Sequence, residues 1–168
     1  RRMADIVDEV YAADPQRRRR VVSSQAANTH IIKQILKENE LAKHCDAIAI
    51  APYVTFNVPL DGRDSQPGAA EVAGWSLDRM FEHLRGVCLP ESTARIDAHA
   101  EVARANGLDL VAYEGGQHLS ALGEAMNNKA LVEILIAANR DPRMGDIYTD
   151  YINHWTQAGG KQHNFFTS

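Results

Sequence analysis

The sequence has few cysteines and no long apolar run. Its 168 residues include only two cysteines, Cys45 and Cys88, too few for a disulfide-stabilised scaffold. Neither belongs to a CxxC pair, and we expect both to be ordinary buried or half-buried thiols. No apolar stretch approaches the roughly 20 residues that a membrane-spanning helix needs. The sequence therefore predicts neither a disulfide framework nor a transmembrane segment.

A basic field is also missing. The formal net charge is −4, so there is no excess positive charge to attract nucleic acid or anionic lipid. The one basic run, Arg17 to Arg20, has no aromatic or glycine-rich neighbours and is predicted to be a solvated turn before a strand. We expect neither nucleic acid nor a membrane as a partner.

Motifs that bind nucleotides or metals are absent too. GxGxxG and GxxxxGK[ST] do not occur, and the seven histidines show neither HxH nor HExxH spacing. These absences disfavour a metal-dependent hydrolase or oxidase, and we expect no metal site and no cofactor.

What is present is an alternation of short apolar runs with amphipathic segments. With 45% hydrophobic residues the chain can form one sizeable core. The apolar runs predict strands at Arg19–Ala26, Asp46–Tyr53 and Leu108–Tyr113, with a fourth beginning in HNFFTS at residues 163–168. Helical spacing predicts helices over residues 3–13, from Asn28 or Thr29 to about 36, over 77–84, 90–106, 129–139 and 144–155.

This order predicts an α/β fold with a parallel sheet and right-handed crossovers. The missing phosphate loop disfavours a nucleotide-binding doubly wound sheet, and a (β/α)₈ barrel typically needs about 250 residues. Four strands in 168 residues make about half of one. We therefore expect a single domain, residues 1–168, that forms the C-terminal half of a TIM barrel.

Hydrogen-bonding side chains follow the predicted strands. In parallel α/β folds the carboxyl ends of the strands meet on one face, where ligands bind. Each residue has a local alternative, such as a helix cap for Gln25 or Asn28, but together they favour a polar ligand such as a sugar. The set comprises Ser24, Gln25, Asn28, Tyr53, Glu114, Gln117, His118, His163 and Asn164.

Glu114 is the sharpest candidate, because it ends the buried strand in LVAYEGGQH. A partly desolvated carboxylate there can act as a nucleophile or as a general acid or base. Gly115 and Gly116 are expected to leave space for a ligand. The alternative interpretation is an acid that interacts with the dipole of a following helix.

The segment from Asn57 to Gly68, NVPLDGRDSQPG, is rich in turn formers and charge. It follows Tyr53 closely, so we expect a long loop that shapes the ligand cleft, with Asp61, Arg63 and Asp64 near the ligand.

Tyr-Glu-Gly-Gly at residues 113–116 resembles the strand-seven nucleophile region of the clan A glycoside hydrolases, which are retaining (β/α)₈ glycosidases. The ordered set SSQAAN, DAIAIAPY, LVAYEGGQHL and NRDPRMGDIYTDYINHW is similar to bacterial proteins labelled cellulose-binding or glycoside-hydrolase-like. This resemblance covers the chain from about Val21 to Phe166. It implies that the four strands are barrel strands five to eight, that Glu114 is the nucleophile, and that Tyr53 hydrogen-bonds it.

The resemblance further implies a carbohydrate partner and a set of sugar contacts. Candidate substrate-binding residues are Gln25, Asn28, Asp61, Gln117, His118 and Asn164. In that family the acid/base carboxylate ends strand four, which is expected upstream of Arg1, and the tryptophan often found after strand eight is missing from HNFFTS.

Two functions stay open. One is a retaining glycoside hydrolase-like protein acting on a β-linked poly- or oligosaccharide, with this chain alone inactive. The other is a non-catalytic carbohydrate-binding or cellulose-binding barrel, for which Trp75 and Trp155 are candidate aromatic platforms. Trp155 lies in the apolar stripe of its helix and is expected in the core. Localisation and oligomeric state are left open.

Overall fold

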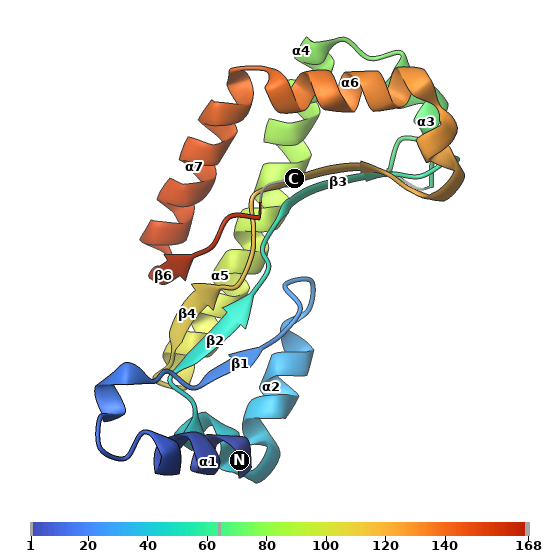
Figure 1. Ribbon diagram of the computed structural model, residues 1–168. Coiled ribbons are helices and arrows are strands. Elements are labelled where there is room, and N and C mark those ends of the chain that lie inside the picture. Colours follow the sequence, from blue (N-terminus) through green and yellow to red (C-terminus); the bar gives the residue numbers. More distant parts are fainter. Residues whose placement is uncertain (1, 64, 167–168) are drawn as a thin grey trace. The chain divides into compact units, whose positions relative to one another are not determined.

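The protein is a mixed α/β fold with parallel strands (Figure 1). The computed structural model describes residues 2–63 and 65–166, except for the side chain of Asn39. The chain forms two compact units. Unit 1 comprises Arg1–Pro52, Ala94–Gly115 and Trp155–Ser168, and unit 2 comprises Tyr53–Thr93 and Gly116–His154.

Unit 1 is built on a four-stranded sheet. Its order is β1-β2-β4-β6, which is also the order of these strands along the chain, and all neighbours are parallel. The strands are β1 (Val21–Ser23), β2 (Ala47–Ile50), β4 (Asp109–Ala112) and β6 (Gly160–His163). The helices within this unit are α1 (Arg2–Val10), η1 (Pro15–Arg17), α2 (Thr29–Lys37) and η2 (Glu38–His44).

Unit 2 contains a parallel pair of strands, β3 (Val54–Val58) and β5 (Gln117–Ala121). Two long helices contribute to both units: α5 (Leu89–Ala105) begins in unit 2, as does α7 (Arg143–Gln157). The remaining helical segments of unit 2 are α3 (Ala69–Ala73), α4 (Leu77–His83), η3 (Leu84–Cys88), η4 (Gly123–Asn127) and α6 (Lys129–Arg140).

The first three predicted strands are confirmed with shorter bounds, and the fourth prediction is wrong in position. The strand β6 ends at His163, so HNFFTS mostly follows it rather than forming it; residues 167 and 168 lie outside the described residues. The strands β3 and β5 were not predicted. Alternate burial of Val54, Phe56 and Val58 explains β3, so the expected long loop begins only after Val58.

The two helices predicted between residues 77 and 106 are continuous. The segments α4, η3 and α5 follow one another without a break, and η3 is π-helical. The π-helical turn precedes Pro90, whose missing N–H interrupts the regular hydrogen-bond ladder. A proline in the first turn of α5 therefore does not separate the two helices.

The core of unit 1 lies on both faces of its sheet. Ile48, Ile50 and Leu110 are buried on one face, whereas Ala47, Ala49 and Val111 form a buried cluster of smaller residues on the other. Burial of all four residues of β2 confirms the expected strand covered on both sides.

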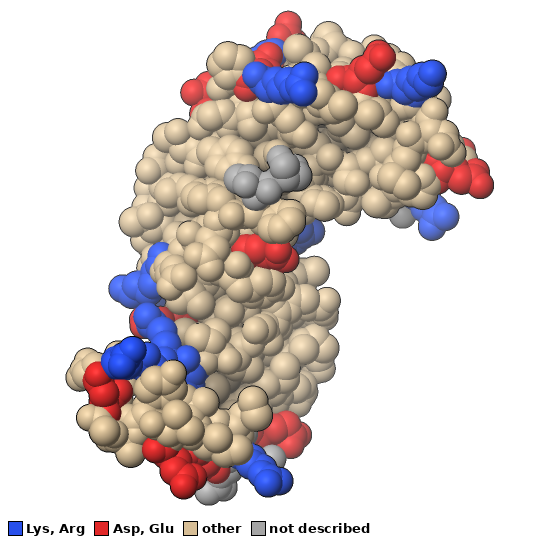
Figure 2. Space-filling view, in the orientation of Figure 1, with Lys and Arg blue, Asp and Glu red and all other residues tan. Residues whose placement is uncertain are grey.

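Other sequence predictions have clear outcomes. Trp155 is a core residue, 2% exposed, as expected. Cys45 is half-buried, Cys88 is buried, and neither forms a disulfide bond, which confirms that prediction. In the part of the chain that the structure describes, no helix is long and apolar enough to cross a membrane. On the face shown in Figure 2, acidic and basic side chains lie near one another at the top of the view, and several basic side chains gather at the lower left beside acidic ones.

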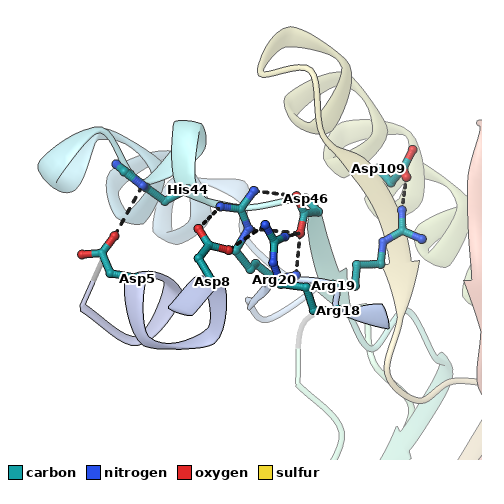
Figure 3. A network of polar contacts seen from close by, with 8 residues as sticks. All are labelled: Asp5, Asp8, Arg18, Arg19, Arg20, His44, Asp46 and Asp109. Atoms are coloured by element: carbon teal, nitrogen blue, oxygen red, sulfur yellow. Dashed lines mark hydrogen bonds and ion pairs between the residues drawn. The ribbon is translucent and has the colours of Figure 1, made fainter. Parts of the chain in front are cut away.

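The run Arg17–Arg20 is more than a solvated turn. Arg18 and Arg20 are half-buried and form ion pairs with Asp8 of α1 and Asp46 at the start of β2 (Figure 3). The Arg20 guanidinium lies 2.8 Å from Asp46 Oδ1, and the Arg20 N–H donates to Asp46 Oδ2 at 2.7 Å. These contacts join α1, the segment before β1 and the amino end of β2. The expectation of a fully solvated run is therefore wrong for Arg18 and Arg20.

Replacing Asp46 with asparagine should destabilise unit 1 in a pH-dependent way. The side-chain hydrogen bond from Arg20 lowers the pKa of Asp46 from 3.8 to about 2. The carboxylate thus stabilises the fold above about pH 4, and this contribution is lost as the pH falls through about 2. Because the side chain is 32% exposed, we expect a loss of about 1 kcal/mol at pH 7. Urea unfolding of the variant and the unchanged protein, at pH 7 and at lower pH, measures this difference in the free energy of unfolding.

The matched control is Asp14→Asn, because Asp14 is exposed and its side chain makes no capping hydrogen bond. An effect of Asp46→Asn that equals the control at pH 7, or that stays constant down to about pH 2, would contradict the role given to this ion pair.

Candidate functional site

The carboxyl ends of the unit 1 strands carry the polar side chains that the sequence predicts there. The Ser24 Oγ after β1 is buried and has no hydrogen-bond partner among the described residues. Gln25 is exposed, and Asn28 caps α2, its Oδ1 accepting from the His30 N–H at 2.8 Å. The capping role of Asn28 is thus confirmed, whereas sugar contacts by Gln25 and Asn28 stay predictions.

Glu114 follows the carboxyl end of β4 and is half-buried. Within residues 2–63 and 65–166, its carboxylate has no hydrogen bond or ion pair. Residues 114–116 lead into the strand β5 and not into a helix. The alternative interpretation of Glu114 as an acid that interacts with the dipole of a following helix is therefore wrong.

Glu114 lies in the connection between β4 and β5, which is one residue longer than the connection between their partner strands β2 and β3. Three residues, Ala51–Tyr53, separate β2 from β3, whereas four residues, Tyr113–Gly116, separate β4 from β5. Both strand pairs are parallel and in regular register. The extra residue acts like a β-bulge, a feature that often redirects a side chain beside a functional site.

Gly116 has a backbone conformation that favours glycine, and Tyr148 packs closely against it. Its φ is +126°, a conformation that other residues rarely adopt, and an added Cβ would lie 2.8 Å from the Tyr148 hydroxyl oxygen. The same hydroxyl accepts a hydrogen bond from the Gln117 N–H at 3.2 Å, and the Gly116 carbonyl accepts one from the Val54 N–H at 2.9 Å. The Tyr148 hydroxyl thus fills the space that was expected at Gly116 for a ligand.

Unit 2 brings together Tyr53, Gln117 and His118. The rings of Tyr53 and His118 are tilted at 56° with their centroids 5.6 Å apart. Gln117 pairs with Val54, the residue after Tyr53, at the start of the β3–β5 ladder. Three of the candidate residues therefore form one group, and the hydrogen bond from Tyr53 to Glu114 stays a prediction.

Asp61 lies in a loop of unit 2, and Asn164 belongs to unit 1. Asp61 is exposed in the loop after β3, which is closed by hydrogen bonds between Arg63 and Gln66 at 3.0 and 2.8 Å. Asp64, a further predicted contact, lies outside the described residues. Asn164 belongs to unit 1, where its Oδ1 accepts from the Gln162 Nε2 at 3.1 Å.

His99 on α5 has no clear signal in the sequence. It is fully buried, and its Nδ1 lies 2.9 Å from the Arg95 carbonyl. Burial lowers the pKa of His99, while interactions with the backbone of Arg95 and of Gln25 act in the opposite direction. The His99 Nε2 is buried and has no hydrogen-bond partner among the described residues.

The tyrosines of α7 also have a role that helical periodicity does not reveal. Tyr151 is fully buried, and burial raises its pKa, an effect that a hydrogen bond to the backbone of Gly116 opposes. Together with Tyr148, it fixes the start of β5. Gly116 adopts a positive φ, and helical spacing does not reveal that both tyrosines lie against this residue.

The described side chains give no sign of a metal centre. Among residues 2–63 and 65–166, no group of three or more His, Cys, Asp or Glu side chains is arranged to hold a metal ion. In unit 1 the candidate residues are a carboxylate, amides and a hydroxyl at the strand ends, and in unit 2 they include the tyrosine–histidine contact. Each set by itself consists of groups suited to a neutral polar ligand.

Comparisons with known proteins do not assign a family. The chain matches no protein-family model, no curated protein and no solved structure.

Replacing Gly116 with alanine should destabilise the protein by about 1–3 kcal/mol, because the positive φ and the Tyr148 hydroxyl both oppose a Cβ. The matched control is Gly145→Ala in α7, where an added Cβ meets no atom within 4 Å. That control should stabilise the helix by about 0.5–1 kcal/mol. Thermal unfolding of both variants measures the difference, and shifts of the same sign and size would refute this explanation of Gly116.

Proposed function

We propose that the protein is a retaining glycoside hydrolase-like protein that acts on a β-linked poly- or oligosaccharide, with Glu114 as the nucleophile. The observation that carries this proposal is the half-buried Glu114 carboxylate, which follows the carboxyl end of β4 and has no partner among the described residues. Carboxylates at this end of parallel strands are typical catalytic groups in barrel enzymes.

The strand order supports a barrel. A doubly wound sheet reverses its strand order at a switch point, where its ligand binds. In unit 1 the order β1-β2-β4-β6 follows the chain without a reversal, as in a (β/α)₈ barrel. We propose that these strands correspond to barrel strands five to eight, and that β1 and β6, the edges of the sheet, adjoin the other half.

The proposed reaction begins with attack by a Glu114 oxygen on the anomeric carbon. A glycosyl–oxygen bond forms to Glu114 while the bond to the leaving group breaks, and the leaving oxygen takes a proton from a second carboxylic acid. In retaining enzymes the two carboxyl groups lie about 5–5.5 Å apart. Tyr53 would hydrogen-bond the nucleophile. Sugar hydroxyls would be contacted by Gln25, Asn28, Asp61, Gln117, His118 and Asn164.

Only one of these two carboxylates belongs to the strand ends. Among the described residues, Glu114 is the one carboxylate within four residues of the carboxyl end of a unit 1 strand. The chain would therefore supply the nucleophile without the acid, and by itself it should not hydrolyse unactivated β-linked oligosaccharides.

A fluorosugar with a fluoride leaving group tests this proposal directly. Fluoride leaves without a proton, so formation of the glycosyl–enzyme bond needs the nucleophile alone. Intact mass spectrometry should show one sugar per chain, and peptide mapping should place it on Glu114. Glu114→Gln should abolish the label.

Glu101→Gln is the control, because Glu101 is an exposed carboxylate on α5 of the same unit. It should be labelled as fully as the unchanged protein. Label on another residue, or equal label in the Glu114→Gln variant, would overturn the assignment of the nucleophile.

The second candidate function is a carbohydrate-binding barrel without catalysis, which the lone carboxylate at the strand ends favours. In that case the chain would bind β-linked oligosaccharides, acquire no covalent label, and bind them as well with Glu114→Gln. Isothermal titration calorimetry beside the labelling experiment distinguishes the two functions.

A further inference from the structure

The strand β5 of unit 2 has an open outer edge. It pairs with β3 on one side, and in the described part of the chain these two strands form a sheet of their own. The Leu122 N–H donates to the Val58 carbonyl, so the alternation along the ladder turns the backbone groups of Ser120 toward β3 and those of Leu119 outward. The Leu119 N–H and carbonyl have no partner among residues 2–63 and 65–166. An unpaired edge of this kind can accept another strand.

An apolar groove lies beside the open edge. It has a volume of about 250 Å³ and is formed by β5, η4 and α6. Among the described residues that line it none is charged, and its Met126 and Ile136 are 63% and 44% exposed. Edge strands usually carry a charge or a proline that prevents pairing, whereas Gln117–Ala121 contains no Lys, Arg, Asp, Glu or Pro. The edge and the groove together therefore form a surface suited to a partner protein.

The charges next to the groove favour a second copy of this chain as that partner. Glu133 precedes Ile136 by three residues and Arg140 follows it by four, so all three lie on one side of α6. Glu133 and Arg140 are exposed, and neither forms an ion pair with a described residue. A two-fold axis beside Ile136 would place Glu133 of each copy opposite the partner's Arg140, because the two charges lie at similar distances on either side of it. The same axis would align the two β5 edges antiparallel.

We propose that the protein forms a two-fold symmetric dimer through β5 and α6 of unit 2. The outward backbone groups of Leu119 pair with those of the second copy, which joins the two small sheets into one. Met126 and Ile136 are covered by the same side chains of the partner, and Glu133 forms an ion pair with the partner's Arg140. The dimer does not depend on the proposed function, because the strand ends of unit 1 have no part in it.

Sedimentation velocity over a range of protein concentrations tests this dimer, with a Kd expected to be roughly micromolar. Ile136→Lys should weaken dimerisation by at least about tenfold, because the two-fold axis brings two buried cations together. The matched control is Val87→Lys. Val87 is a β-branched helical residue of unit 2 with a similar exposed fraction, 42%, and it lies outside the groove. This control should dimerise like the unchanged protein, and circular dichroism checks that both variants are folded.

A charge exchange tests the arrangement of the two copies. Glu133→Arg and Arg140→Glu should each weaken the dimer about tenfold, because each places like charges opposite one another twice in the interface. The variant with both changes should recover the original affinity.

Hydrogen exchange tests the strand pairing. Raising the protein concentration should slow exchange of the Leu119 amide, whereas the Ser120 amide faces β3 already and should change little. Glu114→Gln should dimerise like the unchanged protein, so a failure of the proposed function leaves this dimer intact.

Four results would overturn the proposal. They are a monomer at every concentration, equal weakening by Ile136→Lys and Val87→Lys, no recovery in the charge-exchange variant, and Leu119 exchange that is independent of concentration. A monomer whose β5 edge binds some other extended peptide would overturn it too, because the occupant would then not be a second copy.

Discussion

The parallel pairing of two chain segments is the interaction on which both units depend. Residues 47–50 pair with 109–112 in unit 1, and the continuations of the same segments, 54–58 and 117–121, pair in unit 2. The first segment has three residues, 51–53, between its two strands, and the second has four, 113–116. The surplus residue lies in Tyr113–Gly116, so Glu114 belongs to the one part of this pairing that is irregular.

The two ends of the unit 1 sheet have contrasting chemistry. At the amino ends, Arg19 and Arg20 form ion pairs with Asp109 and Asp46, and in this cluster the Arg18 Nε has no hydrogen-bond partner among the described residues. At the carboxyl ends, the Ser24 hydroxyl and the Glu114 carboxylate have no partners among the described residues. Buried polar groups are normally paired. This difference is why a ligand is proposed at one end of the strands and a structural role is given to the other.

The sequence predicts the buried strands and the caps well, because their signals are local. DAIAIAPY is apolar almost throughout, and Asn28 has the side chain that a helix N-cap needs. The strand β5 is different: QHLSA is mostly polar and half-exposed, and it becomes a strand because β3 pairs with it. Such a tertiary cause leaves no periodic pattern.

Some residues of the candidate site follow from local patterns in the sequence, and others do not. A carboxylate after a buried strand makes Glu114 a candidate from the sequence, and its role stays a prediction. The β3–β5 ladder brings Tyr53 close to His118. The packing of Tyr148 against Gly116 and the burial of His99 depend on contacts between distant segments, so no spacing rule finds them.

The most direct test of the account is an experimental structure of the protein with a bound β-linked oligosaccharide. The account predicts that a sugar lies at the carboxyl ends of the unit 1 strands, with its anomeric carbon about 3–3.5 Å from a Glu114 carboxylate oxygen. An oligosaccharide bound only elsewhere, with Glu114 remote from every anomeric carbon, would contradict it.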